Sequence, residues 1–374
     1  MESALQLNYR LTSNNYQKVK NIYHYRVLNN WRKQNIMRSV FMLLCLLLSV
    51  TLHAAEAPPL QIASLGDFKL ENGDVIQDAK IAYRTAGTLN ADRSNVILFP
   101  TWFTGTSEEL FTSDAVGAVD TSQFFLITVD ALANGISSSP SNSTQQPQRN
   151  FPVVSIGDMV QSQHQLLTEV LGITHLHAVI GISMGGMQAY EWVTTYPEFM
   201  DRAVPIVGSP RLASYDLLLW TAQLIALEQA LDCDCNETTA LEVAGMISHL
   251  ALYSPDFHAR QDPHDQGAAL LKDGRAGGMT LAINDRVAQL QAMIAHDVSI
   301  SFDGEWPATA DAVKAEILAV VGTYDHMVTP GPALTFAELT NSQTLVFDND
   351  CGHQSFRCEQ DRAFEEIRAF LSTP

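Results

Sequence analysis

The pentapeptide Gly181-Ile-Ser-Met-Gly185 is the sequence feature that most constrains how this chain folds. It follows an apolar run, residues 176–182 (LHAVIGI), and it opens a segment with helical periodicity, residues 184–196. A sharp turn at such a junction lifts the serine above the sheet and needs small neighbours to avoid clashes. We therefore predict a strand that leads directly into a helix, with Ser183 as a catalytic nucleophile.

Short apolar runs elsewhere are typical of strands that are buried on both faces of a parallel sheet. They cover residues 95–100 (NVILFP), 124–130 (FFLITVD) and 202–207 (RAVPIV). Residues 158–171 have helical periodicity, so the order fits repeated strand–helix units. An antiparallel strand pair is predicted across residues 61–85, around an Asn-Gly-Asp turn. The predicted fold class is α/β, with a doubly wound, mostly parallel sheet.

The middle of the chain changes pattern from strands to helices. Helical periodicity covers residues 212–231, 238–252 and 279–296. Strand patterns return at residues 315–322 and 343–347, and an amphipathic helix is predicted at residues 358–371. We predict an upstream extension plus signal peptide at 1–55, the first part of the sheet domain at 56–210, an inserted helical cap at 211–310, and the second part of the sheet domain at 311–374.

A secretory signal is predicted across residues 37–55. Arg38 precedes an apolar run, residues 40–52, and small residues follow it. The run has 13 residues, whereas about 20 apolar residues are needed to span a bilayer. We expect a periplasmic or secreted protein without stable membrane insertion after signal cleavage, and we interpret residues 1–36 as an extension upstream of the true start codon. An uncleaved N-terminal anchor is the alternative.

Charge and cysteine content limit the partners. A net charge of −19 argues against nucleic acid, because binding its backbone requires concentrated Lys and Arg. Cys233, Cys235, Cys351 and Cys358 follow the predicted signal and allow three disulfide connectivities in an exported protein. We favour Cys351–Cys358, which would brace the segment that holds His353, and free thiols are the alternative. The Cys-x-Cys spacing lacks a second close pair, so no metal site is predicted.

A serine hydroxyl becomes a good nucleophile only when a base held by a carboxylate removes its proton. In proteins with this strand–turn–helix serine, the three residues follow the order Ser, acid, His. Asp325 and His353 each come directly after a late strand-like run, at the edge where such sheets gather site residues. We therefore predict the triad Ser183, Asp325 and His353, with Asp348 and Asp350 as alternative acids.

The other histidines fit the predicted order less well. His164, His175 and His177 precede the nucleophile, and His326 adjoins Asp325 in the sequence. For each of them the simpler interpretation is a surface or core histidine.

The oxyanion hole is predicted to use two backbone N–H groups. One belongs to Met184, directly after the nucleophile and at the positive end of the following helix. The other lies in the loop after residues 95–100, where Phe103 is the favoured donor, although Trp102 and Phe103 also suit a purely structural role. No cofactor is predicted.

Parts of the chain resemble the homoserine O-acetyltransferase family. The stretches are residues 181–206 (GISMGGMQAYEWVTTYPEFMDRAVPI), 151–160 (FPVVSIGDMV) and 95–105 (NVILFPTWFTG). The resemblance implies an α/β-hydrolase fold in which the serine carries an acetyl group from acetyl-CoA to the hydroxyl of homoserine. It places the triad on Ser183, Asp325 and His353, and it matches Phe103 to the family's second oxyanion donor.

Two departures from this family concern the substrate. Gln354 follows the histidine where the family usually has an Asp, and the cap lacks the family's run of Arg and Tyr residues. An exported enzyme would also meet little acetyl-CoA or homoserine. We therefore predict an exported serine hydrolase, esterase-like, that acts on a small-molecule ester or acyl substrate through an acyl-enzyme. The alternatives are an O-acyltransferase of the homoserine O-acetyltransferase type and a non-catalytic binding module on the same fold. The sequence leaves the acyl chain, the alcohol and the oligomeric state open.

Overall fold

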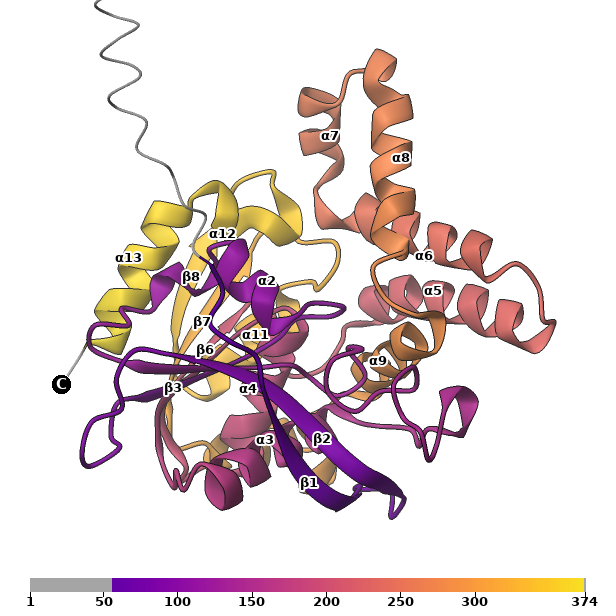
Figure 1. Cartoon of the computed structure of the whole chain (residues 1–374). Helices are drawn as coiled ribbons and strands as arrows, with labels where there is room; N and C mark the ends of the chain where they lie inside the picture. Colours follow the sequence, from indigo (N-terminus) through magenta and orange to yellow (C-terminus); the bar gives the residue numbers. More distant parts are fainter. Residues whose placement is uncertain (1–55, 373–374) are drawn as a thin grey trace, which may run out of the picture. The chain divides into compact units, whose positions relative to one another are not determined.

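The computed structural model describes residues 56–372, and the predicted signal at residues 37–55 lies outside them. An eight-stranded sheet forms the centre, with the order β1-β2-β4-β3-β5-β6-β7-β8 (Figure 1). The strands are β1 (Gln61–Lys69), β2 (Val75–Ala86), β3 (Val96–Pro100), β4 (Phe125–Val129), β5 (Leu176–Ile182), β6 (Met200–Ile206), β7 (Glu316–Gly322) and β8 (Gln343–Phe347). Within the described residues, no helix is both long and apolar enough to cross a membrane.

The pairing of the strands confirms the predicted fold class. β1 pairs antiparallel with β2 across the expected turn, and β2 pairs antiparallel with β4. From β4 to β8 every neighbouring pair is parallel. All five residues of β3 are buried, which explains why its sequence is a continuous apolar run instead of an alternating one.

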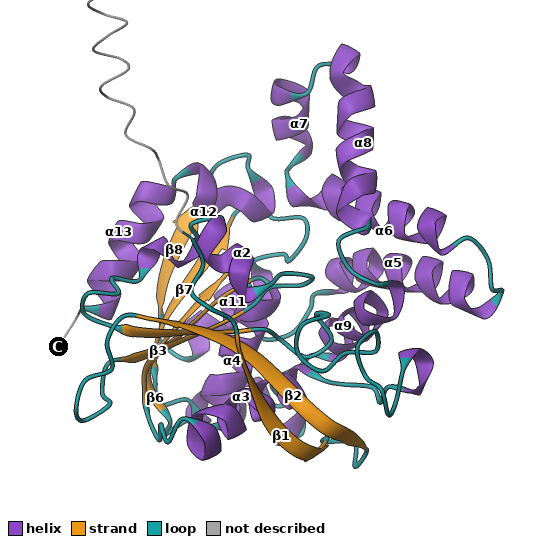
Figure 2. Ribbon diagram, in the orientation of Figure 1, coloured by secondary structure: helices purple, strands orange, loops and turns teal. Residues whose placement is uncertain are grey.

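Helices cover both faces of the sheet, as Figure 2 shows. Flanking the strands are α2 (Ser107–Thr112), α3 (Ile156–Gln165), α4 (Met184–Thr195), α11 (Gly331–Leu339), α12 (Ser355–Cys358) and α13 (Gln360–Leu371). The predicted helix at 158–171 is α3 followed by a π-helical turn, Leu166–Val170.

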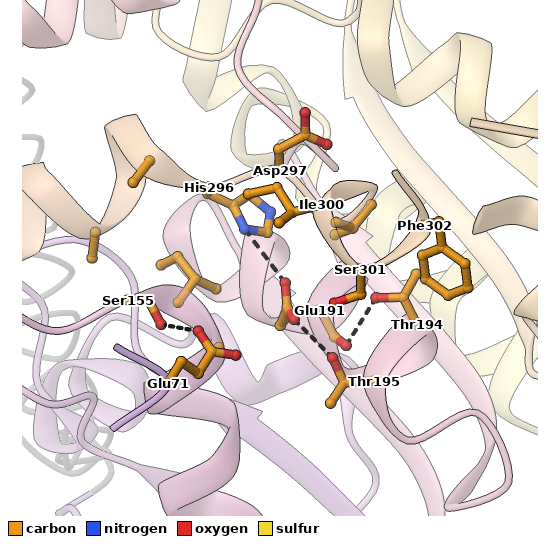
Figure 3. Close-up of a pocket in the computed structure, with 15 residues that line it drawn as sticks. Glu71, Ser155, Glu191, Thr194, Thr195, His296, Asp297, Ile300, Ser301 and Phe302 are labelled. Atoms are coloured by element: carbon orange, nitrogen blue, oxygen red, sulfur yellow. Dashed lines mark hydrogen bonds and ion pairs between the residues drawn. The ribbon is translucent and has the colours of Figure 1, made fainter. Parts of the chain in front are cut away.

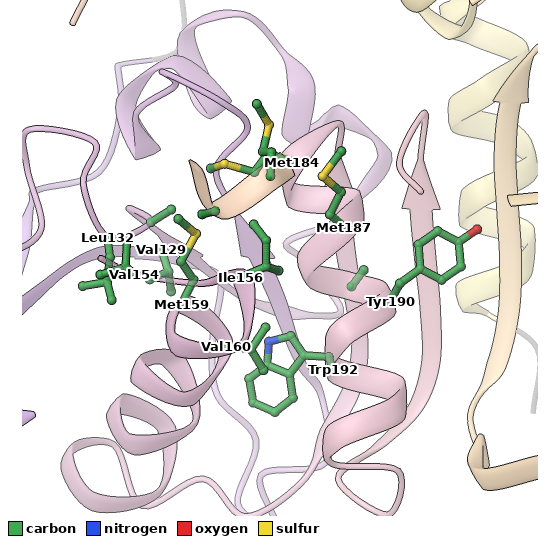
Figure 4. Packing of buried hydrophobic residues seen from close by; sticks show 14 of the residues in the cluster. Val129, Leu132, Val154, Ile156, Met159, Val160, Met184, Met187, Tyr190 and Trp192 are labelled. Atoms are coloured by element: carbon green, nitrogen blue, oxygen red, sulfur yellow. The ribbon is translucent and has the colours of Figure 1, made fainter. Parts of the chain in front are cut away.

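The two faces of the sheet bury separate apolar clusters. Leu98 of β3 belongs to a cluster with Met159 of α3 and Trp192 of α4 (Figure 4). Its neighbour Phe99 belongs to the second cluster, together with Phe364 of α13. Because successive strand residues point to opposite faces, the sheet contributes to both cores.

The segment between β6 and β7 contains helices and 3₁₀ turns joined by loops. Its described residues form no strand, and one isolated β-bridge joins Arg211 to Asp297. The helices are α5 (Ser214–Asp232), α6 (Glu237–Leu252), α7 (Pro255–Gln261), α8 (Gly267–Gly278), α9 (Ile283–Ala295) and α10 (Trp306–Ala312). α5, α6 and α9 confirm the three predicted helical segments, and α10 runs across the predicted boundary at residue 310. The remaining helices of this insertion, α7, α8 and α10, were not predicted.

Glycines explain why α8 escaped prediction. Its sequence, GAALLKDGRAGG, has low intrinsic helix propensity. Gly278 of α8 and Gly245 of α6 let the two helices approach closely. A Cβ on Gly278 would lie 1.8 Å from the carbonyl oxygen of Leu241, and one on Gly245 would lie 2.3 Å from the nitrogen of Gly278. Packing between two helices therefore overrides a weak local preference.

Candidate active site

Ser183 occupies the sharp turn between β5 and α4. Its backbone has φ 58° and ψ −118°, a conformation that L-residues seldom adopt. The flanking glycines make the turn possible, because a Cβ on Gly181 would lie 1.9 Å from the carbonyl oxygen of Gly185, and one on Gly185 would lie 2.7 Å from that of Pro100. The spacing of small residues in the sequence therefore has a direct steric cause.

The structure brings the three predicted triad residues together. The Nε2 atom of His353 lies 2.9 Å from the Oγ of Ser183, and its Nδ1 lies 2.7 Å from the Oδ2 of Asp325. The other carboxylate oxygen of Asp325 accepts hydrogen bonds from the backbone N–H groups of Met327 and Val328, at 2.8 and 2.9 Å. Both oxygens of Asp325 are thus engaged, and the carboxylate is held in the orientation that the histidine needs.

The loop that carries His353 is closed by the favoured disulfide. Cys351 and Cys358 are bonded and flank the short helical turn of residues 352–354. Cys233 and Cys235 form a second disulfide just beyond α5. Within residues 56–372, no group of three or more His, Cys, Asp or Glu side chains is placed to hold a metal ion.

Five of the residues weighed against the triad have other partners. Asp350 forms an ion pair with Arg260, at 2.7 Å. His175 contacts Asp201, and His164 stacks on Tyr196 with ring centroids 4.1 Å apart. The ring of His177 contacts the carbonyl oxygen of Leu371, and His326 lies beside Tyr215.

The two predicted oxyanion donors lie at this site. Phe103 and Ser183 line one pocket, and Met184 begins α4. Within residues 56–372, the N–H groups of Phe103 and Met184 are absent from the backbone–backbone hydrogen bonds of turns, loops and helix caps. Both groups are therefore available for an oxyanion, and their catalytic role stays a prediction.

The pocket beside the triad has a volume of about 520 Å³, and we call it the serine pocket. Its wall includes Trp102, Phe103, Trp220, Arg286 and Gln354. Arg286 was missed in the sequence, although it occupies the face of α9 that also carries the buried residues Ile283, Leu290 and Met293. An arginine at an apolar position of an amphipathic helix is a signal that could have identified it.

Asp216 links α5 to the loop that carries Asp325, the predicted catalytic acid. Its buried carboxylate accepts hydrogen bonds from the backbone N–H groups of Ala213 and Thr329, and from the hydroxyl of Thr329. Burial raises the pKa of Asp216 to about 6, with a smaller contribution from the charge of Asp325. Asp216 thus joins the start of α5 to Thr329, four residues beyond Asp325.

A second cavity, of about 470 Å³, shares none of its lining residues with the serine pocket (Figure 3). Glu71, Glu191 and Asp297 line it together with His296, and we call it the acidic cavity. Burial raises the pKa of Glu191 to about 7 and lowers that of His296 to about 4. The Nε2 of His296 lies 3.2 Å from the carbonyl oxygen of Ser209, so its other ring nitrogen faces Glu191, 3.7 Å away.

Comparisons with known proteins agree with this geometry. A family model for the alpha/beta hydrolase fold matches residues 95–241. A protein of Corynebacterium glutamicum named "Probable esterase" is 42% identical over 178 residues, which are 46% of this chain and 51% of the relative. The homoserine O-acetyltransferase of the same organism is 32% identical over 216 residues, which are 52% of this chain and 57% of that protein. The chain has the α/β-hydrolase fold, and over about half of its length it is similar to an esterase and to a homoserine O-acetyltransferase.

The chain also resembles a solved structure over most of its length. An acetylester hydrolase from Corynebacterium glutamicum superposes with a TM-score of 0.76 at 29% identity, covering 84% of this chain and 95% of that one. The sequence alignments are shorter than this structural match. In them the chain spans slightly more than half the length of the two curated relatives named above.

Proposed function

We propose that this protein is a serine esterase that hydrolyses small-molecule esters through an acyl-enzyme on Ser183. The hydrogen-bonded chain from Ser183 through His353 to Asp325, opening on the serine pocket, is the observation that carries the proposal. Its likeness to an acetylester hydrolase supports the same reaction class.

The reaction begins when the Oγ of Ser183 attacks the carbonyl carbon of the ester while His353 takes the hydroxyl proton. The N–H groups of Phe103 and Met184 receive the developing oxyanion. The tetrahedral intermediate collapses, the C–O bond to the alcohol breaks, and His353 returns the proton to the departing alkoxide. Water, deprotonated by the same histidine, then releases the acid and restores the serine.

Asp325 supports both steps without changing its own protonation state. Because its Oδ2 lies 2.7 Å from the Nδ1 of His353, it keeps the proton on that nitrogen and leaves Nε2 as the base. It also stabilises the imidazolium that forms when the serine is deprotonated.

Acyl transfer is the second candidate function, favoured by the similarity to a homoserine O-acetyltransferase. It uses the same acyl-enzyme, with the homoserine hydroxyl in place of water. Gln354, which follows the catalytic histidine and lines the serine pocket, supplies no carboxylate for an amine. We therefore put hydrolysis first.

We also propose that the protein is exported to the periplasm or secreted. The basic and apolar pattern of residues 37–55 supports this location, and so do two disulfides, since they persist in oxidising compartments. Fractionation of the producing cells, with mass determination of the mature N-terminus, tests it. A full-length chain that stays in the cytoplasm would contradict it.

The activity is tested with 4-nitrophenyl acetate beside homoserine plus acetyl-CoA, and with a fluorophosphonate probe. We expect ester hydrolysis and probe labelling that both disappear in Ser183→Ala. The matched control is Ser301→Ala, because Ser301 lines the acidic cavity. Acetyl transfer without ester hydrolysis would establish the acyltransferase instead, and an unlabelled Ser183 would point to the binding module.

A further inference from the structure

Arg286 is an unpaired cation in the wall of the serine pocket. It is 2% exposed, and its Nε and Nη1 atoms have no hydrogen-bond partner in the described chain. The Nη2 atom has weak contacts, at 3.4 Å with the Oε1 of Gln223 and at 3.2 Å with the Oγ of Ser248. The guanidinium lies 4.9 Å from the ring centre of Phe103, the predicted oxyanion residue.

A buried charge without a carboxylate partner destabilises a protein unless something compensates for it. Burial lowers the pKa of Arg286 to about 10, so the side chain stays protonated at neutral pH. Within residues 56–372, no ion pair includes Arg286. The aromatic face of Phe103 offers only a partial replacement for an anion.

Neighbouring groups add more donors than acceptors. The indole N–H of Trp220 and the amide Nε2 of Gln223 are also buried without a partner in the described residues. Arg357 is a second arginine that lines the serine pocket, and it donates to the carbonyl oxygen of Ser113 at 3.1 Å. No Asp or Glu from the described chain lines this pocket. The wall therefore fits a ligand that is an anionic acceptor.

We propose that Arg286 binds a carboxylate of the substrate, so that the preferred substrates are esters carrying a free carboxylate. This inference rests on the proposed esterase function. A carboxylate is the acceptor that a guanidinium binds most strongly, and the Nε and Nη1 groups of Arg286 have no acceptor within the described chain. The carboxylate belongs either to the acyl half or to the alcohol half of the ester, and the substrates below distinguish the two.

The test compares three substrates: neutral 4-nitrophenyl acetate, mono-4-nitrophenyl glutarate with its carboxylate in the acyl half, and 3-acetoxypropanoate with its carboxylate in the alcohol half. In Arg286→Met we expect the ratio of kcat/KM for the preferred carboxylate ester to that for the neutral ester to fall roughly 10- to 150-fold. This range corresponds to the loss of one charge-assisted hydrogen-bonded pair. Arg286→Lys keeps the charge and should recover part of the ratio.

Arg211→Met is the matched control. Arg211 lies 4.4 Å from the ring centre of Trp306, so it also stacks on an aromatic ring, but it lines neither cavity. Its loss should leave the substrate ratio unchanged. An unchanged ratio in Arg286→Met, with hydrolysis of the neutral ester retained, would overturn the carboxylate proposal and leave the esterase proposal intact. Failure of all three substrates together with an unlabelled Ser183 would instead overturn the esterase proposal.

A binding measurement on protein that keeps Arg286 covers the case in which Arg286→Met does not fold. Glutarate should competitively inhibit hydrolysis of 4-nitrophenyl acetate and should bind to the Ser183→Ala protein, detected by calorimetry. Glutaramide, which has a similar shape without charge, should do neither. Equal behaviour of the two compounds would contradict a carboxylate site.

Discussion

The serine pocket and the acidic cavity are lined by ionisable side chains of opposite sign. Two arginines and no acidic residue line the first, whereas three carboxylates and no Lys or Arg line the second, within the described residues. The whole chain has a net charge of −19. Net charge therefore predicts the average surface and does not predict the pocket beside the nucleophile, which is positive.

The two regions also differ in how they treat a buried acid and a buried base. At the serine pocket, His353 lines the wall and Asp325 lies behind it, 2.7 Å away, and each has a further partner. In the acidic cavity Glu191 and His296 are 3.7 Å apart, and burial favours the neutral form of both. We therefore expect chemistry at the serine pocket, where backbone N–H groups hold Asp325 in place beside His353, and not in the acidic cavity.

Asp325→Asn should have the largest effect. The amide cannot hold the proton on Nδ1 of His353, so the wrong tautomer faces Ser183, and kcat for 4-nitrophenyl acetate should fall about 10⁴-fold. Glu71→Gln in the acidic cavity is the control and should change kcat less than about 3-fold, since surface-type substitutions away from a site seldom perturb it. Comparable losses in both variants would break the distinction between the two regions.

The second prediction concerns the loop that holds His353. Replacing Cys351 and Cys358 together by Ser should lower the free energy of unfolding by roughly 2–3 kcal/mol, because the unfolded chain gains the freedom of a short loop. Urea unfolding measures the change. The disulfide between Cys233 and Cys235 closes a smaller loop, so replacing both cysteines by Ser should lower the free energy of unfolding by less. We expect kcat to change only in the variant that lacks Cys351 and Cys358. A larger loss from the Cys233–Cys235 pair would contradict this assignment.

The third prediction sharpens the description of the acidic cavity. The folded-state pKa of Glu191 lies above its ordinary value of 4.5, at about 7, so the folded protein holds this proton as the pH rises and ionisation destabilises it. Glu191→Gln cannot ionise. Its stability relative to the unmodified protein should therefore increase between pH 5 and pH 7, by on the order of 2 kcal/mol.

His296 gives stability the opposite pH dependence. Burial lowers its pKa to about 4, so the folded state favours the neutral ring, and this contribution to stability is lost as the pH falls toward 4. This contribution is present in both proteins and does not produce the difference. Urea unfolding at pH 5 and pH 7 measures the stability difference between Glu191→Gln and the unmodified protein. Glu338→Gln is the control, because Glu338 is exposed. A pH-independent difference for Glu191→Gln would show that this carboxyl is already ionised at pH 5.

Much of the catalytic half of the molecule could be predicted because its signals are local. The glycines around Ser183 report a steric requirement of one turn, and the apolar runs report strands that are buried on both faces. The chain order of Ser183, Asp325 and His353 follows from the order of the parallel strands, whose ends meet at one edge. The disulfide between Cys351 and Cys358 joins residues only seven positions apart.

Only the tertiary structure decided what surrounds each charge. Arg286 lies beside Phe103, Trp220 and Ser248, which come from a loop and two other helices. Its pattern in the sequence predicts burial, but no local pattern says whether an acid will lie within reach. The free energy of a charge depends on the groups packed around it, and those are brought together by folding rather than by neighbourhood in the chain. For that reason the sequence predicted the nucleophile and its partners, and only the fold placed beside them an arginine without an acidic partner, where we propose that it binds the substrate's carboxylate.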